Sequence, residues 1–347
     1  MQSYSVSFSS GTVAYYPDSS LNELPQVAAT QQTILLVDEK VLSAYGDKLK
    51  LYKTIPMHSG ESHKTLQTAE TIIKDLIRQE VQRNSMLIGV GGGVVTDITG
   101  FIASTYMRGT RVGFVPTTLL GMIDAAIGGK NGVNIGLHKN MMGTIRQPEF
   151  ILYDTSLLGT LQDTEWSNGF AEIIKYALLF DAQLFEELNT HNIDHYQQNK
   201  AALQLLIARC VALKNKIVQA DEQEKDERKL LNFGHTAGHA LENMYHLPHG
   251  HAVGLGMIVA CDLSINTKSL NPDIKQQLIG LLKRYHLPTH LEINPKEVMQ
   301  VLVMDKKRQT NVIDYILLNG VGNAVIQRLS FDTIQRSLET FAHGSHH

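Results

Sequence analysis

The 347-residue sequence is poor in cysteine and has no long run of apolar residues. Its two cysteines, Cys210 and Cys261, lie far apart, which excludes a disulfide framework and a paired-cysteine zinc ribbon. No apolar run reaches the roughly 18–20 residues that span a bilayer, so we expect no membrane segment. The first residues, MQSYSVSFSSG, lack the basic and apolar regions of a signal peptide. We therefore expect a cytoplasmic protein.

Long runs of basic residues are also missing. The formal net charge is -3, and no run of lysine or arginine resembles a nucleic-acid-binding or membrane-binding stripe. We expect no nucleic-acid partner and no membrane partner, whereas a small anionic substrate could still be bound by a few cations. Hydrophobic residues make up 43% and charged residues 19%, which is typical of a globular protein. Residues 344–347 resemble the start of an expression tag and are left out.

Short apolar runs alternate with helical patterns in the first part of the chain. The runs TILLVD (33–38), MLIGV (86–90), VGFV (112–115) and ILYD (151–154) read as buried strands. Between the first two, apolar residues recur at helical spacing from 66 to 77. This alternation predicts an α/β domain with a parallel sheet that is covered on both faces.

From Trp166 onward the pattern is mainly helical. One exception is the pair IDYILL and NAVIQRL, which NGVG separates and which predicts a hairpin. We expect two domains, an α/β domain at 1–160 and a mainly α-helical domain at 161–343.

A glycine-rich segment, GVGGGVVTDITGF (89–101), follows the second predicted strand. Its glycines would let the backbone approach a pyrophosphate, and the helix that follows would add its N-terminal N–H groups. The spacing is GxGGG and not the GxGxxG of the dinucleotide fingerprint, and a tight strand–helix turn is the structural alternative. Asp38, at the end of an earlier strand, could accept a ribose hydroxyl. Together these features favour NAD binding in a Rossmann-like domain.

Cations are concentrated in the segment from 104 to 143, which carries Arg108, Arg111, Lys130 and Lys139 among glycines. We expect the two lysines on loops, where long cations can converge on a phosphate or a carboxylate. Solvated surface charges are the alternative. The segment favours anion binding.

The segment from 233 to 257 contains five histidines. His235 and His239 are four residues apart and would share a helix face, but HTAGH lacks the glutamate of HExxH. The segment HGH (249–251) supplies imidazoles from a second element, and Glu172 is a carboxylate in an apolar helix. Three such donors fit a catalytic metal site, and histidines used for packing or exposed at the surface are the alternative.

Seven motifs in this order resemble those of 3-dehydroquinate synthase: GGGVVTDITGFIASTYMRG, VPTTLL, IDAAIGGKNGVN, KNMMG, AEIIKYALL, DERKLLNFGHTAGHALE and HGHAVGLGM. The resemblance runs from about Asp38 to Lys307. It implies a homodimeric, phosphate-eliminating carbon–oxygen lyase of the shikimate pathway, on the route to chorismate and the aromatic amino acids. The lyase converts 3-deoxy-D-arabino-heptulosonate 7-phosphate to 3-dehydroquinate and phosphate. The steps are transient oxidation by NAD, phosphate elimination, reduction, ring opening and an intramolecular aldol reaction.

The resemblance also implies a divalent metal, zinc or cobalt, held by Glu172, His235 and His249. His239 would then belong to the proton and hydrogen-bond network. The family pattern HGEAV reads HGHAV here, so His251 stands where a glutamate could support a metal-bound imidazole. His251 is also an alternative ligand.

The remaining site residues follow from the same resemblance. The NAD contacts are Asp38, Glu61, Lys64, Gly92, Gly93, Val94, Asp97, Thr117, Thr118, Asp124, Lys130, Lys139, Thr160 and Leu161. The substrate and catalytic residues are Arg108, Lys130, Asn140, Lys175, Lys214, Arg228, Asn232, His239 and, chosen over Lys306, Lys307. Arg108 is expected to reach across a dimer interface. Because the nicotinamide must lie over the substrate carbon C5 while the metal holds the oxygens on C4 and C5, the metal is expected between the two domains.

Three other functions remain open. Another sugar phosphate cyclase, such as 2-deoxy-scyllo-inosose synthase, would share NAD and metal but alter the residues that face the substrate carboxylate. Four residues stand here as dehydroquinate synthase needs them: Lys214, Arg228, Asn232 and His239. A glycerol-dehydrogenase-like oxidoreductase would have no use for the phosphate-binding cations. A non-catalytic NAD-binding protein would bind metal without turnover.

Overall fold

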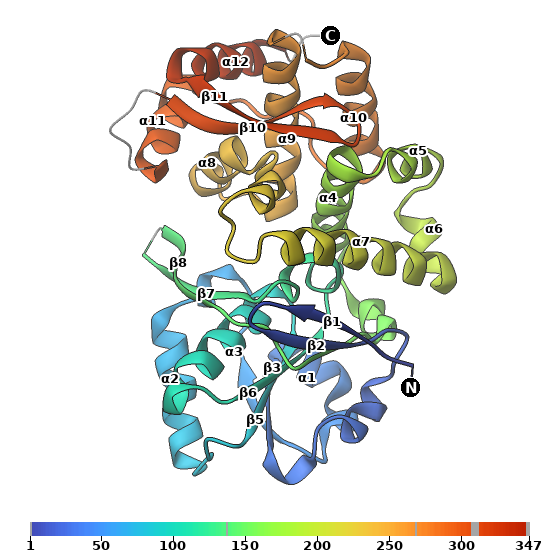
Figure 1. Cartoon of the computed structure of the whole chain (residues 1–347), viewed down its shortest axis with the longest axis vertical. Helices are drawn as coiled ribbons and strands as arrows, with labels where there is room; N and C mark the ends of the chain where they lie inside the picture. Colours follow the sequence, from blue (N-terminus) through green and yellow to red (C-terminus); the bar gives the residue numbers. More distant parts are fainter. Residues whose placement is uncertain (1, 137, 268, 307–311, 345–347) are drawn as a thin grey trace. The chain divides into compact units, whose positions relative to one another are not determined.

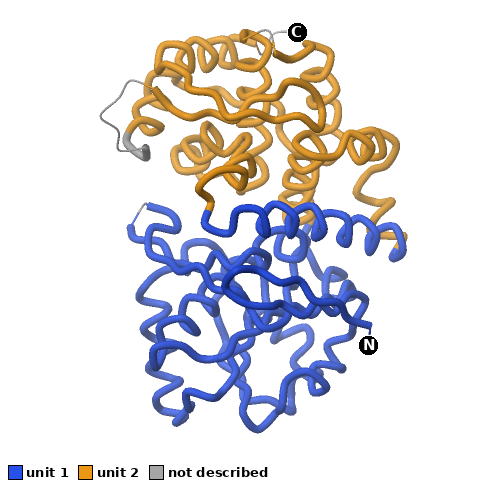
Figure 2. Tube along the Cα trace, in the orientation of Figure 1, with its two compact units in different colours: residues 1–162, 200–223 blue, residues 163–199, 224–347 orange. Residues whose placement is uncertain are grey.

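The structure, a computed structural model, describes residues 2–136, 138–267, 269–306 and 312–344 (Figure 1). The contacts within the chain define two compact units (Figure 2). Unit 1 comprises Met1–Gln162 and Lys200–Gln223, and unit 2 comprises Asp163–Asn199 and Glu224–His347. The expected domain ranges 1–160 and 161–343 stay a prediction.

Unit 1 is built on a seven-stranded sheet with the order β1-β2-β9-β6-β5-β3-β4. Its strands are β1 (Tyr4–Phe8), β2 (Gly11–Tyr16), β3 (Thr33–Asp38), β4 (Lys53–Met57), β5 (Met86–Gly91), β6 (Arg111–Pro116) and β9 (Phe150–Leu152). The β1–β2 pair is antiparallel and every other neighbouring pair is parallel. The four predicted strands correspond to β3, β5, β6 and β9.

Both faces of this sheet are covered, as the continuous apolar runs predict. Met86, Ile88 and Val90 of β5 belong to one buried cluster with residues of β3 and of the segment 21–28. Successive strand residues point to opposite faces. Gly89 faces the other side, where a Cβ atom would lie 2.8 Å from Thr99 Oγ1. The glycine therefore lets the helix that carries Thr99 pack directly on the strand.

Four α-helices accompany this sheet: α1 (Glu39–Tyr45), α2 (Leu66–Arg78), α3 (Gly93–Thr105) and α7 (Lys200–Ala220). Shorter 3-10 segments are η1 (Leu21–Gln26), η2 (Thr30–Gln32), η3 (Gly46–Leu49), η4 (Glu61–His63), η5 (Tyr106–Arg108) and η7 (Thr155–Thr160), and η6 (Gly121–Ala125) is a π-helical turn. Helix α2 begins where the Thr65 hydroxyl accepts the N–H of Thr68 at 3.1 Å, an N-cap.

The strands β7 (Lys130–Ile135) and β8 (His138–Ile145) form a separate antiparallel hairpin. The prediction that Lys130 and Lys139 lie on loops is therefore wrong, because both are strand residues. The glycines of this segment allow close strand pairing here: a Cβ atom on Gly143 would lie 2.4 Å from the carbonyl oxygen of Asn131.

Helix α7 belongs to unit 1, although its neighbours in sequence belong to unit 2. The Tyr15 hydroxyl of β2 donates to Asn215 Oδ1 of α7 at 2.7 Å. Just beyond α7, Glu222 accepts hydrogen bonds from Ser9, Ser10 and Gln147. These bonds fix the β1–β2 turn against the end of the helix.

Unit 2 is mainly helical, as expected from the sequence. Its helices are α4 (Asp163–Phe180), α5 (Ala182–Thr190), α6 (Ile193–Gln198), η8 (Glu227–Asn232), α8 (His235–Tyr245), α9 (His249–Asn266), α10 (Pro272–Arg284), α11 (Pro295–Lys306) and α12 (Phe331–His343). Residues 252–264 of α9 are buried on all sides, so this helix forms the centre of the unit. It contacts α4, α8, α10 and α12.

The predicted C-terminal hairpin is confirmed as β10 (Val312–Gly320) and β11 (Asn323–Ser330). The fold class is confirmed as well: an α/β, Rossmann-like domain with a parallel sheet, and a mainly α-helical domain. Among the described residues, no helix combines the length and the apolar character needed to span a bilayer.

Candidate active site

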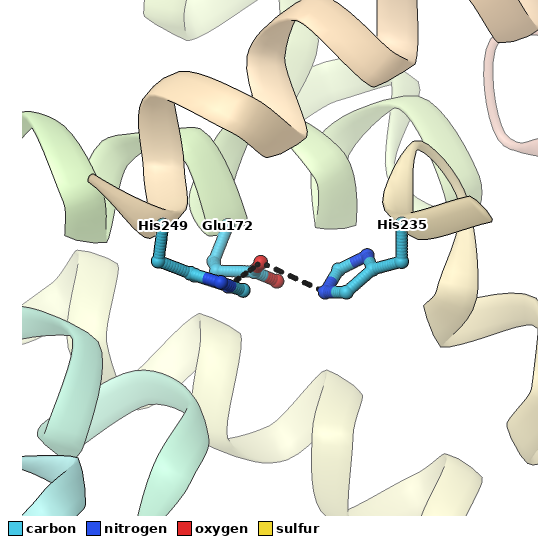
Figure 3. A group of neighbouring side chains, drawn as sticks. All are labelled: Glu172, His235 and His249. Carbon is cyan, nitrogen blue, oxygen red and sulfur yellow. Dashed lines mark hydrogen bonds and ion pairs between the residues drawn. The ribbon is translucent and has the colours of Figure 1, made fainter. Parts of the chain in front are cut away.

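Three side chains of unit 2 converge on one point (Figure 3). Glu172 comes from α4, and His235 and His249 are the first residues of α8 and α9. Glu172 Oε1 lies 3.2 Å from His249 Nε2 and 3.5 Å from His235 Nε2. One ligand atom from each residue lies within 4.8 Å of the other two, so the group can hold a metal ion. These are the three residues that the family resemblance implies as ligands.

The local backbone explains how both histidines reach Glu172. Gly234, just before His235, has a φ of 77°, and a Cβ atom there would lie 2.9 Å from the carbonyl oxygen of Val253. Only glycine fits this left-handed, crowded position. At the start of α9, the Gly250 N–H donates to Asn168 Oδ1 of α4 at 2.9 Å. That bond fixes the first turn of α9 beside the helix that carries Glu172.

Glu172 is fully buried and keeps its charge because of its neighbours. Burial alone raises the pKa of this carboxyl, but Lys175, His235 and His249 outweigh it and hold the pKa well below the ordinary value. The Lys175 ammonium contacts Glu172 Oε2 and donates to the carbonyl oxygen of Leu231 at 2.7 Å. Lys175 therefore occupies one carboxylate oxygen and leaves Oε1 directed at the histidines.

The two imidazoles differ in their protonation. Burial and the nearby Lys175 hold the pKa of His235 well below its ordinary value, so its ring is neutral. His235 Nδ1 lies 3.1 Å from the carbonyl oxygen of Phe233 and must carry the proton, which leaves Nε2 as a free lone pair. Burial lowers the pKa of His249, but Glu172 and Glu242 outweigh it and raise the value to about 9.

A divalent metal suits this group chemically. One buried carboxylate oxygen and two imidazole nitrogens match the three protein ligands of a catalytic zinc site, which leaves a position for a substrate oxygen. A cation placed there would replace the proton of His249 and pair with the Glu172 carboxylate.

Two further residues approach the histidines. The His239 ring lies one helical turn from His235, with centroids 5.2 Å apart, as the spacing predicts. Glu242, which the sequence analysis missed, has Oε2 3.7 Å from His249 Nδ1. The spacing in the sequence could have indicated this residue, because Glu242 follows His235 by seven residues and so lies two turns along the same helix face. His251 is half-buried and is not part of the three-residue group.

In unit 1, several predicted NAD residues follow strands at one edge of the sheet. The chain runs from β3 outward to β4 and then returns to β5 on the other side of β3, so a topological switch point lies between β3 and β5. Val37 pairs with Val90, so Asp38 and Gly91 follow at the same edge. Ligands of open α/β sheets bind outside the strand ends at such a point. Gly92, Gly93 and Val94 begin α3 here, and the Thr117 N–H donates to the carbonyl oxygen of Gly91 at 2.9 Å.

Two charged groups of predicted site residues lie in contact within unit 1. The Lys64 ammonium contacts Asp97 and donates to Asn140 Oδ1 at 2.6 Å. Lys214 Nζ of α7 lies 2.5 Å from both the carbonyl and the carboxylate Oδ1 of Asp124. Burial raises the pKa of Asp97 in spite of Lys64. In each group a predicted NAD residue contacts a predicted substrate residue.

The other predicted residues lie outside these two charged groups. Thr118 Oγ1 accepts the N–H of Gly121 at 3.0 Å, and Glu61 accepts the side chain of Asn134 at 2.9 Å. Arg108 has a φ of 63° in η5, Arg228 is buried in η8, and Asn232 donates to Glu224 at 2.9 Å. The others are Lys130 and Lys139 on the β7–β8 hairpin, and Thr160 and Leu161 at the end of η7. Arg111, one of the four cations of the segment from 104 to 143, forms an ion pair with Glu149. Lys307 lies outside the described residues.

Family models match most of the chain. Residues 54–168 match the N-terminal domain of 3-dehydroquinate synthase, and residues 169–308 match its C-terminal domain. The chain belongs to the 3-dehydroquinate synthase family. It is 42% identical over 301 residues to the 3-dehydroquinate synthase of Dichelobacter nodosus, covering 84% of this chain and 82% of that protein. It is 39% identical to the Pyrococcus abyssi enzyme, covering 91% and 95%.

Solved structures of other sugar phosphate cyclases share the dehydroquinate synthase fold of this chain. The 2-epi-5-epi-valiolone synthase of Streptomyces hygroscopicus subsp. jinggangensis, solved with NAD+ and Zn2+, is 30% identical, with a TM-score of 0.87 and 99% of each chain covered. A 2-deoxy-scyllo-inosose synthase, solved with carbaglucose-6-phosphate, NAD+ and Co2+, is 22% identical, with a TM-score of 0.86 over 97% and 99% of the two chains. A probable glycerol dehydrogenase from Sinorhizobium meliloti shares the fold at 13% identity and a TM-score of 0.63, covering 98% of this chain and 100% of that one.

Proposed function

We propose that this protein is an NAD- and metal-dependent 3-dehydroquinate synthase. It would convert 3-deoxy-D-arabino-heptulosonate 7-phosphate to 3-dehydroquinate and phosphate, a carbon–oxygen lyase reaction of the shikimate pathway. The observation that carries the proposal is the convergence of Glu172, His235 and His249 in a chain of this family. When bound, NAD would take up and return a hydride at the substrate's C5, and the metal, zinc or cobalt, would polarise the oxygens on C4 and C5.

The residues of unit 2 would prepare the metal site and move protons. Glu172 Oε1 and the Nε2 atoms of His235 and His249 are the donors. Lys175 offsets the buried negative charge of Glu172 and keeps the carboxylate oriented. His239 would hold or release a proton beside the substrate, because its ring lies one helical turn from His235.

The residues of unit 1 would bind the dinucleotide. The N-terminus of α3, with Gly92 and Gly93, offers N–H groups to the pyrophosphate. Asp38 already accepts the Ser59 hydroxyl at 2.7 Å, and it would accept a ribose hydroxyl at the same carboxylate.

The substrate carries a phosphate and a carboxylate, and the proposal assigns cations and one amide to these two groups. Arg108, Lys130 and Asn140 would bind the phosphate, and Lys214 and Arg228 the carboxylate. Each of these contacts adds a charge-assisted hydrogen bond that fixes the orientation of the substrate. A homodimer to which Arg108 contributes across the interface, and a cytoplasmic location, complete the proposal.

Phosphate release from 3-deoxy-D-arabino-heptulosonate 7-phosphate tests this function, with and without NAD and after treatment with EDTA. We expect release that requires NAD, stops after EDTA and returns with zinc. A valiolone or inosose synthase would instead use a sugar phosphate that lacks the carboxylate. A polyol dehydrogenase would accumulate NADH from glycerol, and a non-catalytic protein would bind metal and NAD without releasing phosphate.

A further inference from the structure

The β7–β8 hairpin has an irregularity at Asn134. Val133 pairs with Met142 and Ile135 pairs with His138, so three residues of β8 lie opposite the single residue Asn134. Asn140, in the middle of these three, has a φ of 53°, which is uncommon for a residue other than glycine. A bulge of this kind leaves backbone groups without strand partners.

The side chain of Asn134 provides a hydrogen-bond acceptor for one backbone N–H of this bulge and also contacts a residue outside the hairpin. Asn134 Oδ1 accepts the N–H of Asn140 at 2.9 Å, and Nδ2 donates to Glu61 Oε1 at 2.9 Å. The Asn134 backbone N–H donates to the carbonyl oxygen of Lys64 at 2.8 Å. One residue therefore joins the loop that carries Glu61 and Lys64 to the strand that carries Asn140.

These contacts bear on a charged group of the candidate site. The Lys64 ammonium lies between Asp97 and Asn140 Oδ1, so its position depends on where the backbone of Asn140 is held. Without an acceptor for its N–H, the left-handed conformation of Asn140 would lose a hydrogen bond that stabilises it. Glu61 would likewise lose a neutral donor that restrains its carboxylate.

We propose that Asn134 is a positioning residue that holds Glu61 and Asn140 in the geometry used to bind the dinucleotide and the phosphate-bearing substrate. This inference rests on the proposed function, which assigns Glu61 and Lys64 to NAD and Asn140 to the substrate. Asn134 Nδ2 would then support NAD binding through Glu61, and Asn134 Oδ1 would support substrate binding through Asn140.

Two substitutions separate these roles. Asn134→Ala removes both side-chain bonds, so the NAD dissociation constant and the substrate KM should each rise about 10-fold, with kcat lowered less than about 3-fold. Asn134→Asp keeps an acceptor for the Asn140 N–H but sets a carboxylate against Glu61. We expect its NAD dissociation constant to rise about 10-fold while KM stays within about 3-fold of wild type. Calorimetry on the zinc-loaded protein gives the NAD affinity, and steady-state kinetics give KM and kcat.

A double substitution tests whether Asn134 acts through Glu61. In Asn134→Asp combined with Glu61→Gln, the introduced amide can donate to the introduced carboxylate, which restores the bond in reverse. The double variant should bind NAD within about 3-fold of Glu61→Gln alone, whereas independent effects would multiply to about 10-fold weaker binding. Independent effects would overturn the proposed link.

Thr144→Val is the matched control, because it removes one hydrogen bond from the same hairpin, the 2.9 Å contact of Thr144 with Ser104 of α3. Its NAD affinity and KM should match wild type. If Asn134→Ala also matches wild type in both, the inference is wrong. If that variant does not fold, the isosteric Asn134→Asp and its combination with Glu61→Gln decide. Wild-type protein that binds NAD but releases no phosphate contradicts the proposed function alone, because the affinity comparison still stands.

Discussion

Replacing Glu172 by glutamine should destabilise unit 2 as well as weaken metal binding. The side chains of Glu172 and Lys175 are 0% and 3% exposed, and they form a buried ion pair. Glu172→Gln keeps the shape of the side chain but leaves the Lys175 ammonium without its counter-ion. Lys175 retains only its bond to the Leu231 carbonyl oxygen among the contacts described above.

The size of this effect follows from burial. Removing one partner of a buried ion pair costs about 3–5 kcal/mol, and the retained carbonyl contact favours the lower end. A loss of about 3 kcal/mol should lower the melting temperature by about 6–12 °C in a domain of this size. Metal affinity should fall by more than the roughly 10–100-fold that changes behind the ligands cause.

Thermal unfolding in the presence of EDTA measures the first effect without any contribution from metal. Glu186→Gln, the same chemical change at an exposed position on α5, is the control and should leave the melting temperature unchanged. Glu172→Gln combined with Lys175→Met should recover much of the loss, because no charge is then left buried. A Glu172→Gln protein as stable as wild type in EDTA would refute the reasoning.

Three further changes have defined outcomes. Lys214→Met removes the ammonium beside Asp124, and kcat/KM for the heptulosonate phosphate should fall about 10- to 150-fold while zinc content stays constant; an unchanged value would remove Lys214 from the substrate site. Glu242→Ala takes away the carboxylate near His249 Nδ1, and chelator competition should show zinc held about 10–100-fold more weakly, whereas equal affinity would contradict this support. For Glu222, burial raises the carboxyl pKa but hydrogen bonds from Ser10, Ser9 and Gln147 outweigh it, so the pKa is lowered from its ordinary value of 4.5. Its stabilising effect is therefore present above that value and lost as pH falls through the lowered pKa. Glu222→Gln should be less stable than wild type near pH 7, and the difference in melting temperature should shrink in acid; a difference independent of pH would be inconsistent with this.

The sequence predicted those parts of the fold that depend on continuous apolar patterns. The run TILLVD coincides with β3 from Thr33 to Asp38, because a strand buried on both faces must be apolar throughout. The β1–β2 hairpin was not predicted, since β1 is only five residues long, is mostly exposed and alternates serine with Tyr4, Val6 and Phe8 instead of forming a continuous apolar run. The β7–β8 hairpin was missed because its glycines resemble turn signals, whereas they allow close strand pairing.

The candidate site shows a similar division. Glu172 could be singled out because a carboxylate in an apolar helix needs a partner, and the family motifs pointed to the same residue. The partnership of Lys64 with Asp97 and Asn140 could not be derived from spacing, because it joins three separate segments. Asn134 ends the motif IDAAIGGKNGVN, but neither its spacing nor the family resemblance assigned it a role. Its importance follows only from the contacts that a bulge creates in three dimensions.

The central claim is a cyclisation in which NAD is used and returned. The most direct test follows phosphate, 3-dehydroquinate and NADH together in one reaction of the zinc-loaded protein with 3-deoxy-D-arabino-heptulosonate 7-phosphate and NAD. We expect equal amounts of phosphate and dehydroquinate over many turnovers, with no accumulation of NADH. NADH that rises in step with substrate consumption, or phosphate release that needs no NAD, would contradict it.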